Sequence, residues 1–560
     1  MKRPVKRMEV SMQELEDILE RAKTSALTDE DCAKLHKALE TLEYLTNLVG
    51  DKDTTISKLR KILFGATTEK IRNILGREGA KAGSQLTDPN QTGSPENASG
   101  GPAAESSSEK PKGHGRNGAE AFTGAKRVVV PHASLKPGQR CPKCEKGKIY
   151  RIKEPAVLVR ITGQAPLQAT IYELERWRCN LCGQVFTAEA PEGVGPGRWD
   201  EAAISMVGVL RYGTGTPFHR LEQLQKSLGT PLPASTQWEM VKEGAEVIEP
   251  VCDELIRQAA QGEVLHNDDT TAKILELIRE RRKREQNGEA GDPTERTGTF
   301  TSGIVSIAQG RKIALFFTGR QHAGENLRDV LLKRAAGIAP PIQMCDGLAR
   351  NEPELPDELK VILSNCNAHS RRQFVDVASR FPEECRYVLE VFRDVYHNDA
   401  VARREGMTPE ECLTFHKANS GPRIEELRCW MAEQIDEKKV EPNSGLGEAI
   451  LYTQKRWDRL TRFLEVPGVP LDNNAAERIL KKSILSRKNS YFYKTARGAH
   501  VGDMYMSLIH TAELVGANPF DYLTQLQKHS SEIKSNPSQW MPWNYLESID
   551  HAEKDTTSPD

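Results

Sequence analysis

The sequence of 560 residues has no apolar run long enough to span a bilayer, and no apolar signal core follows its charged start, MKRPVKRMEV. These absences predict a soluble, intracellular protein. The sequence also lacks an excess of either charge. Its 78 Lys and Arg residues nearly balance its 79 Asp and Glu residues, which gives a net charge of -1. Any affinity for nucleic acid must therefore come from local basic patches rather than from the field of the whole chain.

Cysteine is scarce, and the eleven cysteines do not suggest a disulfide framework. Four of them form two Cys-x-x-Cys pairs, Cys141 with Cys144 and Cys179 with Cys182. The pairs are separated by 34 residues, of which the stretch VLVRITGQAPLQATIYELERWR predicts strands. Two such pairs on hairpin turns can supply four thiolates to one structural zinc ion. Two redox pairs are the alternative, although neither pair opens a helix after a strand. We expect a small β zinc-binding module at 125–190.

The length predicts several domains, three or four. In the first 81 residues a heptad repeat of apolar residues indicates a coiled coil, or else a helical hairpin broken at Gly50 and Asp51. Residues 82–124 are rich in Gly, Ser, Pro and Asn, which predicts a flexible linker. Residues 191–260 predict helices around Gly229, and this helical segment is either a DNA-binding helix-turn-helix or a plain packed hairpin.

Three acids lie at positions that suit a metal site. The stretch EVLHNDDT predicts a strand that ends at Asp268 or Asp269, and only one of these neighbours can face a shared site. Two antiparallel strands joined at Gln309 and Gly310 should follow, and then a strand that ends at Asp346. Glu477 lies in the first turns of a predicted helix, which Asp472 or Asn473 can cap.

Basic residues surround the third acid and predict a nucleic-acid surface. Those on the same helix are Arg478, Lys481, Lys482, Arg487 and Lys488. Arg371 and Arg372, at the start of an earlier predicted helix, either grip phosphate or form an ordinary solvated face. A lone acid among so many basic groups would repel DNA unless a metal ion lay between them.

A strand-end Asp, a second Asp at the end of the neighbouring strand and a helix-borne Glu are the arrangement that an RNase H-like α/β domain uses to hold two divalent metals. Carboxylates suit Mg²⁺, and two ions about 4 Å apart activate the attacking oxygen and stabilise the leaving one. We therefore expect an RNase H-like catalytic core at 261–525 with a helical insertion at about 375–470, and a polar C-terminal tail at 526–560.

Several short motifs resemble the IS66 family of bacterial insertion-sequence transposases. In the family's order they are FGATTEK (64–70), GHGRN (113–117), the two Cys-x-x-Cys pairs, HNDDT (266–270), CDG (345–347), CNAHSRRQF (366–374), and LDNNAAER (471–478) followed by SRKNSYF. They cover nearly the whole chain up to about Ser530. The sequence departs from the usual pattern at Asp269, where the family more often has Glu, and at Asn367, where it more often has Trp.

The resemblance implies a DDE-type transposase whose catalytic acids are Asp268, Asp346 and Glu477, with Asp268 preferred over Asp269. Its cofactors would be two catalytic Mg²⁺ ions and one structural Zn²⁺. Its partners would be double-stranded DNA (terminal repeats and target), further copies of the chain and companion proteins of the same element, without a membrane. The implied location is the bacterial cytoplasm, on the nucleoid when DNA is bound.

Two other functions fit the same residues. A metal-dependent RNase H-like nuclease would cut DNA without joining it, and a pre-cleaved element end distinguishes the two because only a transposase joins that end to a target. A zinc-containing DNA-binding regulator would use the acids structurally, and it predicts no Mg²⁺-dependent cleavage and no loss of function when Glu477 is replaced.

Overall fold

The computed structural model describes residue 28 and residues 136–140, 146–148, 150, 165–178, 185–192, 194, 197–287 and 296–550. The predicted coiled coil, the predicted linker and the four paired cysteines lie outside these residues. The chain divides into two compact units. The second unit, 88–374 with 390–560, contains the sheets and the acids described below.

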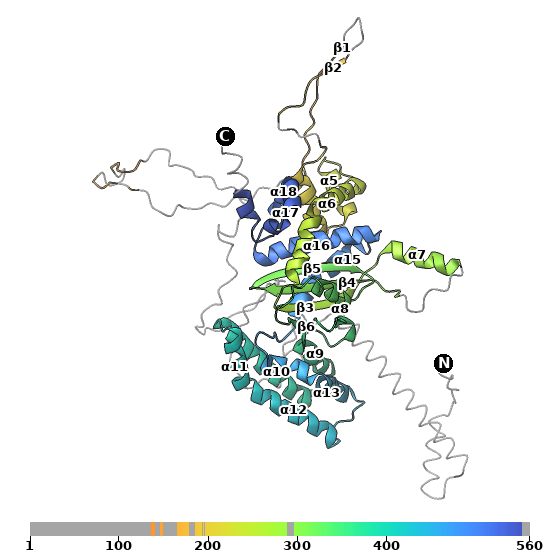
Figure 1. The fold of residues 1–560 in the computed structure, drawn as a ribbon, viewed down its shortest axis with the longest axis vertical. Coiled ribbons are helices and arrows are strands. Elements are labelled where there is room, and N and C mark those ends of the chain that lie inside the picture. The colour runs from red at the N-terminus through yellow and green to blue at the C-terminus, as the bar shows by residue number, and fades with distance from the viewer. Residues whose placement is uncertain are drawn as a thin grey trace, which may run out of the picture. The chain divides into compact units, whose positions relative to one another are not determined.

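A five-stranded mixed sheet forms the centre of the second unit (Figure 1). Its strands, in spatial order, are β5 (Arg311–Gly319), β4 (Phe300–Ala308), β3 (Val264–Thr271), β6 (Ile342–Cys345) and β7 (Ile362–Asn365). The pairs β5–β4 and β4–β3 are antiparallel, whereas β3–β6 and β6–β7 are parallel. This mixed sheet with its many helices is consistent with an RNase H-like fold.

The turn between β4 and β5 lies at the predicted place. Gln309 and Gly310 have φ angles of 50° and 77°, and two consecutive positive values give the turn a twist that matches antiparallel strands. The register runs without interruption from Ala308 opposite Arg311 to Phe300 opposite Gly319. The predicted hairpin is therefore confirmed.

The helix α16 (Ala496–Val515) covers the free edge of β5. The backbone N–H groups of Ala314, Phe316 and Thr318 donate to the side chains of Thr511, Ser507 and Asp503, at 3.0, 3.0 and 2.6 Å. Four helical residues and two strand residues both advance about 6 Å, so the two spacings match. This row of hydrogen bonds occupies an edge that would otherwise pair with another chain.

The predicted pair of helices in 191–260 is present as α5 (Phe218–Ser227) and α6 (Ala234–Ala259), after α4 (Glu201–Gly208). Gly229, with a φ angle of 77°, turns the chain between α5 and α6. The buried amide of Gln237 donates to the carbonyls of Phe218 and Leu232 and fixes the two helices together. One face of α6, from Val241 to Leu255, belongs to the hydrophobic core.

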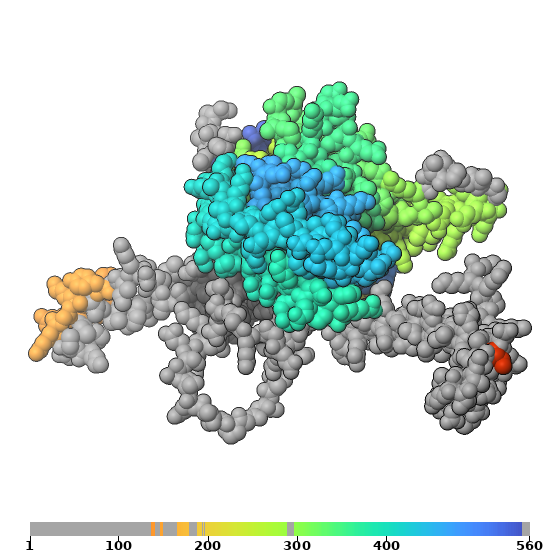
Figure 2. Space-filling model, turned by 90° about the horizontal axis from the view of Figure 1, so that it is seen from below, coloured from red at the N-terminus to blue at the C-terminus, as the bar shows by residue number. Residues whose placement is uncertain are grey.

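The charged insertion after β3 contains α7 (Leu275–Gln286), in which no residue is buried. Its base is fixed by the N–H groups of Leu275 and Glu276, which donate to the carbonyls of Tyr493 and Lys494. In Figure 2 this helix stands out from the rest as a yellow-green arm.

The described chain between β7 and the helix of Glu477 is helical. It contains α9 (Asn367–Val377), α10 (Pro382–Arg404), α11 (Pro409–Asn419), α12 (Gly421–Asp436), α13 (Gly445–Lys455) and α14 (Trp457–Leu460). The part of this segment that belongs to the second unit appears in teal and blue across the near face in Figure 2. These helices occupy the range in which a helical insertion was expected.

Residues 526–550 are packed, whereas the sequence predicts a polar tail at 526–560. After α17 (Pro519–Lys528) come α18 (Ser530–Ser535) and a short 3-10 helix, Pro537–Trp540. Ile533, Trp540 and Tyr545 are buried in the same core as α6 and α16. Composition does not predict this packing, because the few buried apolar residues are separated by many polar ones.

Candidate active site

Asp268 and Asp346 lie at the same level of two parallel neighbouring strands. The β3–β6 ladder pairs Val264 with Ile342 and His266 with Met344, and two further residues along each chain lead to Asp268 and Asp346. The amide Nδ2 of Asn351 donates to Oδ1 of Asp346 at 2.6 Å and lies 3.5 Å from Oδ1 of Asp268. One amide thus reaches both carboxylates.

The electrostatics of Asp268 show that its neighbours are acids. Burial, together with the smaller effects of the charges of Asp346, Asp269 and Glu477, raises the pKa of Asp268 to about 7, against a hydrogen bond from the Asp269 N–H that lowers it. Clustered carboxylates that repel one another in a partly buried site favour the binding of a cation.

Asp269 points to a different set of partners. Its carboxylate lies 2.7 Å from Nδ1 of His322 and 3.3 Å from the guanidinium of Arg350, and its side chain is only 1% exposed. The imidazole of His322 stands before the helix α8 (Ala323–Leu331) and packs against Phe300, with ring centroids 4.1 Å apart. Asp269 therefore holds the surroundings of β3 together, while Asp268 faces Asp346.

Glu477 lies in the first turn of α15 (Asn474–Ser490), and Asn473 ties the start of this helix to β3. The buried Asn473 amide donates to the carbonyl of Asn267 at 3.0 Å, and its oxygen lies 3.2 Å from Nδ1 of His266. Burial lowers the pKa of His266 to about 4, so this imidazole is neutral and its Nδ1–H donates to Asn473. These bonds join segments more than 200 residues apart.

The sequence left open whether Asp472 or Asn473 caps α15. The carboxylate of Asp472 accepts from the backbone N–H and the side-chain amide of Asn474, at 3.1 and 2.7 Å. Asn473 makes no side-chain cap, because its amide is used on β3.

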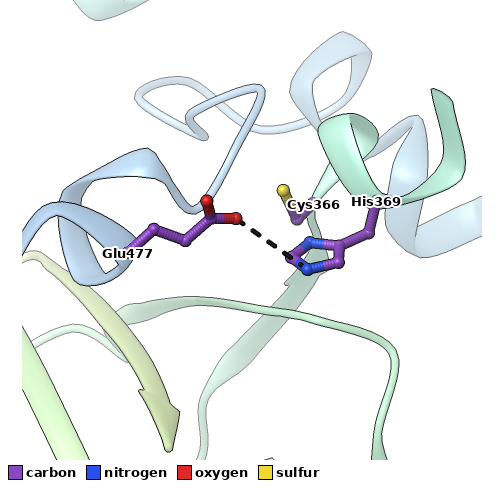
Figure 3. Close-up of side chains that lie close together, drawn as sticks. All are labelled: Cys366, His369 and Glu477. Carbon is purple, nitrogen blue, oxygen red and sulfur yellow. Dashed lines mark ion pairs between the residues drawn. The ribbon is translucent and has the colours of Figure 1, made fainter. Parts of the chain in front are cut away.

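Cys366 and His369 lie beside Glu477 (Figure 3). Nε2 of His369 is 3.8 Å from Oε1 of Glu477, and the thiol of Cys366 accepts a hydrogen bond from the Asn473 N–H at 3.2 Å. Burial raises the pKa of Cys366 to about 12, which keeps the free thiol protonated. Glu477 Oε1 and His369 Nδ1 are buried and have no hydrogen-bond partner among the described residues.

Sequence reasoning missed three of these residues. Asn351 follows Asp346 by only five positions but is brought back by a 3-10 turn, Ala349–Asn351. Asn473 was considered only as a cap. Cys366 belongs to the motif CNAHSRRQF, and its spacing of three residues from His369, at a helix start, is a pattern known from metal sites.

The donor set fits a hard divalent cation. Asp268, Asp346 and Glu477 offer carboxylate oxygens, one of which is an orphaned buried atom, and Mg²⁺ prefers such oxygens. Asp268 and Asp346 converge through Asn351, and the charge of Glu477 is close enough to shift the pKa of Asp268.

The basic residues around Glu477 differ in their environments. Arg478, Lys481, Lys482 and Lys488 are exposed on α15, and Lys482 lies 3.3 Å from Glu513. Arg487 is half-buried, and its guanidinium donates to Thr270 and to the carbonyl and hydroxyl of Thr271, at the end of β3. On α9, Arg371 is half-buried and Arg372 is exposed.

The four paired cysteines lie outside the described residues, but residues on both sides of each pair are bridged to one another. Arg140 bridges Lys148 in antiparallel fashion around the first pair. The strands β1 (Arg176–Arg178) and β2 (Val185–Thr187) pair antiparallel around the second. Among the helices in the described ranges, none is long and apolar enough to cross a membrane.

Comparison with known proteins identifies the family. The chain matches the model of the Transposase IS66 family over residues 196–501, more than half of its length, and this range includes Asp268, Asp346 and Glu477. It is also similar to two uncharacterized proteins of Sinorhizobium fredii. The protein y4jD is 24% identical over 90% of this chain and 96% of its own length, and y4hP is 23% identical over 75% of each. The chain therefore belongs to the IS66 family of transposases.

Proposed function

We propose that this protein is the DNA transposase of an IS66-like insertion sequence, which binds the element's ends and catalyses Mg²⁺-dependent cleavage and strand transfer. The observation that carries the proposal is the matched level of Asp268 and Asp346 on parallel strands, with one amide reaching both carboxylates. Glu477 completes the trio from a helix that is tied to the same strand.

In this proposal the three carboxylates hold two Mg²⁺ ions. When bound, the ions would activate the attacking oxygen and neutralise charge on the phosphate and the leaving oxygen. Asn351 keeps the two aspartates together, and Asn473 holds the first turn of α15 against β3. Asp269, paired with His322 and Arg350, fixes the backbone that carries Asp268.

The proposed reaction has two in-line displacements. In the first, the oxygen of a water molecule bonds to a phosphorus at the element's end, and the bond to the 3′-oxygen breaks and leaves a 3′-hydroxyl. In the second, this hydroxyl loses its proton and attacks a phosphorus of target DNA, whose own 3′-oxygen leaves with a proton. No covalent bond to the protein is required.

The proposed DNA surface combines two sets of basic residues near the acids. One lies on α15 and the other at the start of α9, and together they are Arg371, Arg372, Arg478, Lys481, Lys482, Arg487 and Lys488. Since the net charge of the chain is only -1, such local groups must supply the phosphate contacts. Arg487 takes part indirectly, because its guanidinium already bonds to Thr270 and Thr271.

The proposal includes a structural zinc ion on Cys141, Cys144, Cys179 and Cys182. Its support is the antiparallel pairing on both sides of each cysteine pair, which suits ligands on hairpin turns. Joining two ends to one target also calls for more than one copy of the chain on the DNA. Companion proteins of the same element are further proposed partners.

A strand-transfer assay tests the proposal. Duplex DNA that carries the terminal repeats flanking the gene, supplied intact and pre-cleaved, is incubated with a target plasmid and Mg²⁺. We expect cleavage of the intact end and joining of the pre-cleaved one, and neither with Asp268→Asn, Asp346→Asn or Glu477→Gln. Asp329→Asn, which changes an exposed acid on α8, is the matched control. Cleavage without joining would indicate a nuclease, and full activity of the Glu477 variant would refute the assignment.

A further inference from the structure

Three potential metal ligands meet beside the proposed magnesium site. Cys366 directly follows β7, His369 lies in the first turn of α9, and Glu477 lies in the first turn of α15. One ligand atom from each lies within 4.8 Å of the other two (Figure 3). The ligand atoms of a tetrahedral zinc ion are roughly 3.3–3.8 Å apart, so small side-chain movements would close the site.

We propose that Cys366, His369 and Glu477 form a second kind of metal site, which takes a borderline-soft divalent ion such as Zn²⁺ and draws Glu477 away from Asp268 and Asp346. The competition for Glu477 rests on the proposed transposase function. The existence of the site does not.

The donor chemistry selects the ion. A cysteine sulfur disfavours Mg²⁺ and Ca²⁺, which prefer oxygen, whereas sulfur, imidazole and carboxylate together are ordinary zinc ligands. Three protein ligands leave a fourth position open for water, unlike a structural zinc site, which four protein ligands close.

The buried polar atoms at the cluster suit a bound cation. Oε1 of Glu477 is buried without a hydrogen-bond partner among the described residues, although it is 3.8 Å from the His369 ring. A buried carboxylate oxygen without a partner is costly, and a cation between it and the imidazole would remove that cost. The Asn473 N–H already donates to the Cys366 sulfur, as outer groups do at thiolate ligands.

The geometry has a functional consequence. Glu477 is the only residue common to the cluster and to the acidic trio, so occupation of the cluster competes for its carboxylate. Zn²⁺ at concentrations that fill the cluster should therefore inhibit Mg²⁺-dependent cleavage. Removing the sulfur or the imidazole should weaken this inhibition.

Zinc binding to the full-length protein tests the site directly. Metal-free wild type, Cys366→Ser and His369→Gln are titrated with Zn²⁺ against a chromophoric chelator, and circular dichroism checks that each variant is folded. Cys429→Ser, which changes an exposed cysteine on α12, is the matched control. We expect both cluster variants to bind one zinc ion fewer than wild type, or to bind it at least about tenfold more weakly. Equal binding by folded wild type and Cys366→Ser would overturn the proposal.

A second measurement separates this inference from the proposed function. Cleavage in Mg²⁺ is followed as Zn²⁺ is added, and each protein is compared with its own zinc-free rate. Inhibition that is weaker in Cys366→Ser than in Cys429→Ser supports competition for Glu477, and equal inhibition refutes that competition. If no protein cleaves DNA, the proposed function fails, whereas the zinc stoichiometry still decides whether the site exists.

Discussion

Two carboxyl groups at one sheet, Asp503 on α16 beside the edge strand β5 and Asp268 on the central strand β3, each have a pKa raised to about 7, mainly by burial. Their surroundings differ. Both oxygens of Asp503 accept hydrogen bonds from Thr318, at 2.6 and 2.7 Å. Asp268 instead faces Asp346, and the charge of Glu477 contributes to its raised pKa. A raised pKa alone therefore does not identify a functional acid.

The two acids differ in what stabilises each carboxylate. The hydrogen bonds of Asp503 are closed within the protein and join α16 to β5, so this acid is structural. The repulsion around Asp268 is relieved only by a proton or a cation, and this leaves the site ready for metal. Replacing each of the two acids tests this contrast.

The largest expected effect follows replacement of Asp268. Asp268→Asn should reduce cleavage by at least about a thousandfold, because a ligand of the proposed ions is lost. In Mg²⁺-free buffer at pH 8 the same variant should melt no lower than wild type, because a buried repulsive charge is removed. Cleavage assays and thermal melts measure the two effects. A variant that keeps its activity would remove Asp268 from the proposed catalytic trio.

Asp503→Asn should change the pH dependence of the protein's stability and leave DNA cleavage unchanged. The folded-state pKa is raised from 3.8 to about 7, so the folded protein binds this proton more tightly than the unfolded chain. The resulting stabilisation is complete below pH 3.8 and is lost as the pH rises to about 7, a loss of up to about 4 kcal/mol. Urea unfolding between pH 4 and pH 8 should show a shallower fall in the variant. Parallel curves would show that Asp503 does not titrate as described.

Replacement of Asn351 tests whether its amide positions Asp268 and Asp346. Asn351→Ala removes the 2.6 Å hydrogen bond to Asp346, and we expect cleavage to fall about 10- to 100-fold, as is common for groups that orient metal ligands. The concentration of Mg²⁺ that gives half-maximal activity should rise, a change that lost stability alone would not produce. Asn398→Ala, which loses a hydrogen bond to Ser420 among the inserted helices, is the control and should keep the wild-type Mg²⁺ dependence.

Local patterns were sufficient to predict much of this arrangement. The hairpin at Gln309 and Gly310, the strand before Asp346 and the helix of Glu477 all follow from apolar patterning and turn residues. Asn351 could not be predicted, because its role depends on a short turn that folds it back onto Asp346. The hydrogen bond between Asn473 and Asn267 spans 206 residues, and local sequence periodicity cannot predict a contact at that separation. The same holds for the meeting of Cys366 and His369 with Glu477.

The smallest effects concern the basic residues of α15, of which Arg478 and Lys488 are exposed and Arg487 is half-buried. Arg478→Ala and Lys488→Ala should each weaken DNA binding severalfold, and each should reduce the slope of log K against log salt by about one, because an exposed phosphate contact is lost. Arg487→Ala should mainly lower the melting temperature, because its guanidinium bonds to Thr270 and Thr271. Fluorescence anisotropy at several salt concentrations, together with thermal melts, distinguishes the two classes. If Arg487→Ala changed the salt slope as much as Arg478→Ala without loss of stability, Arg487 would contact phosphate directly, and its bonds to β3 would have to open when DNA binds.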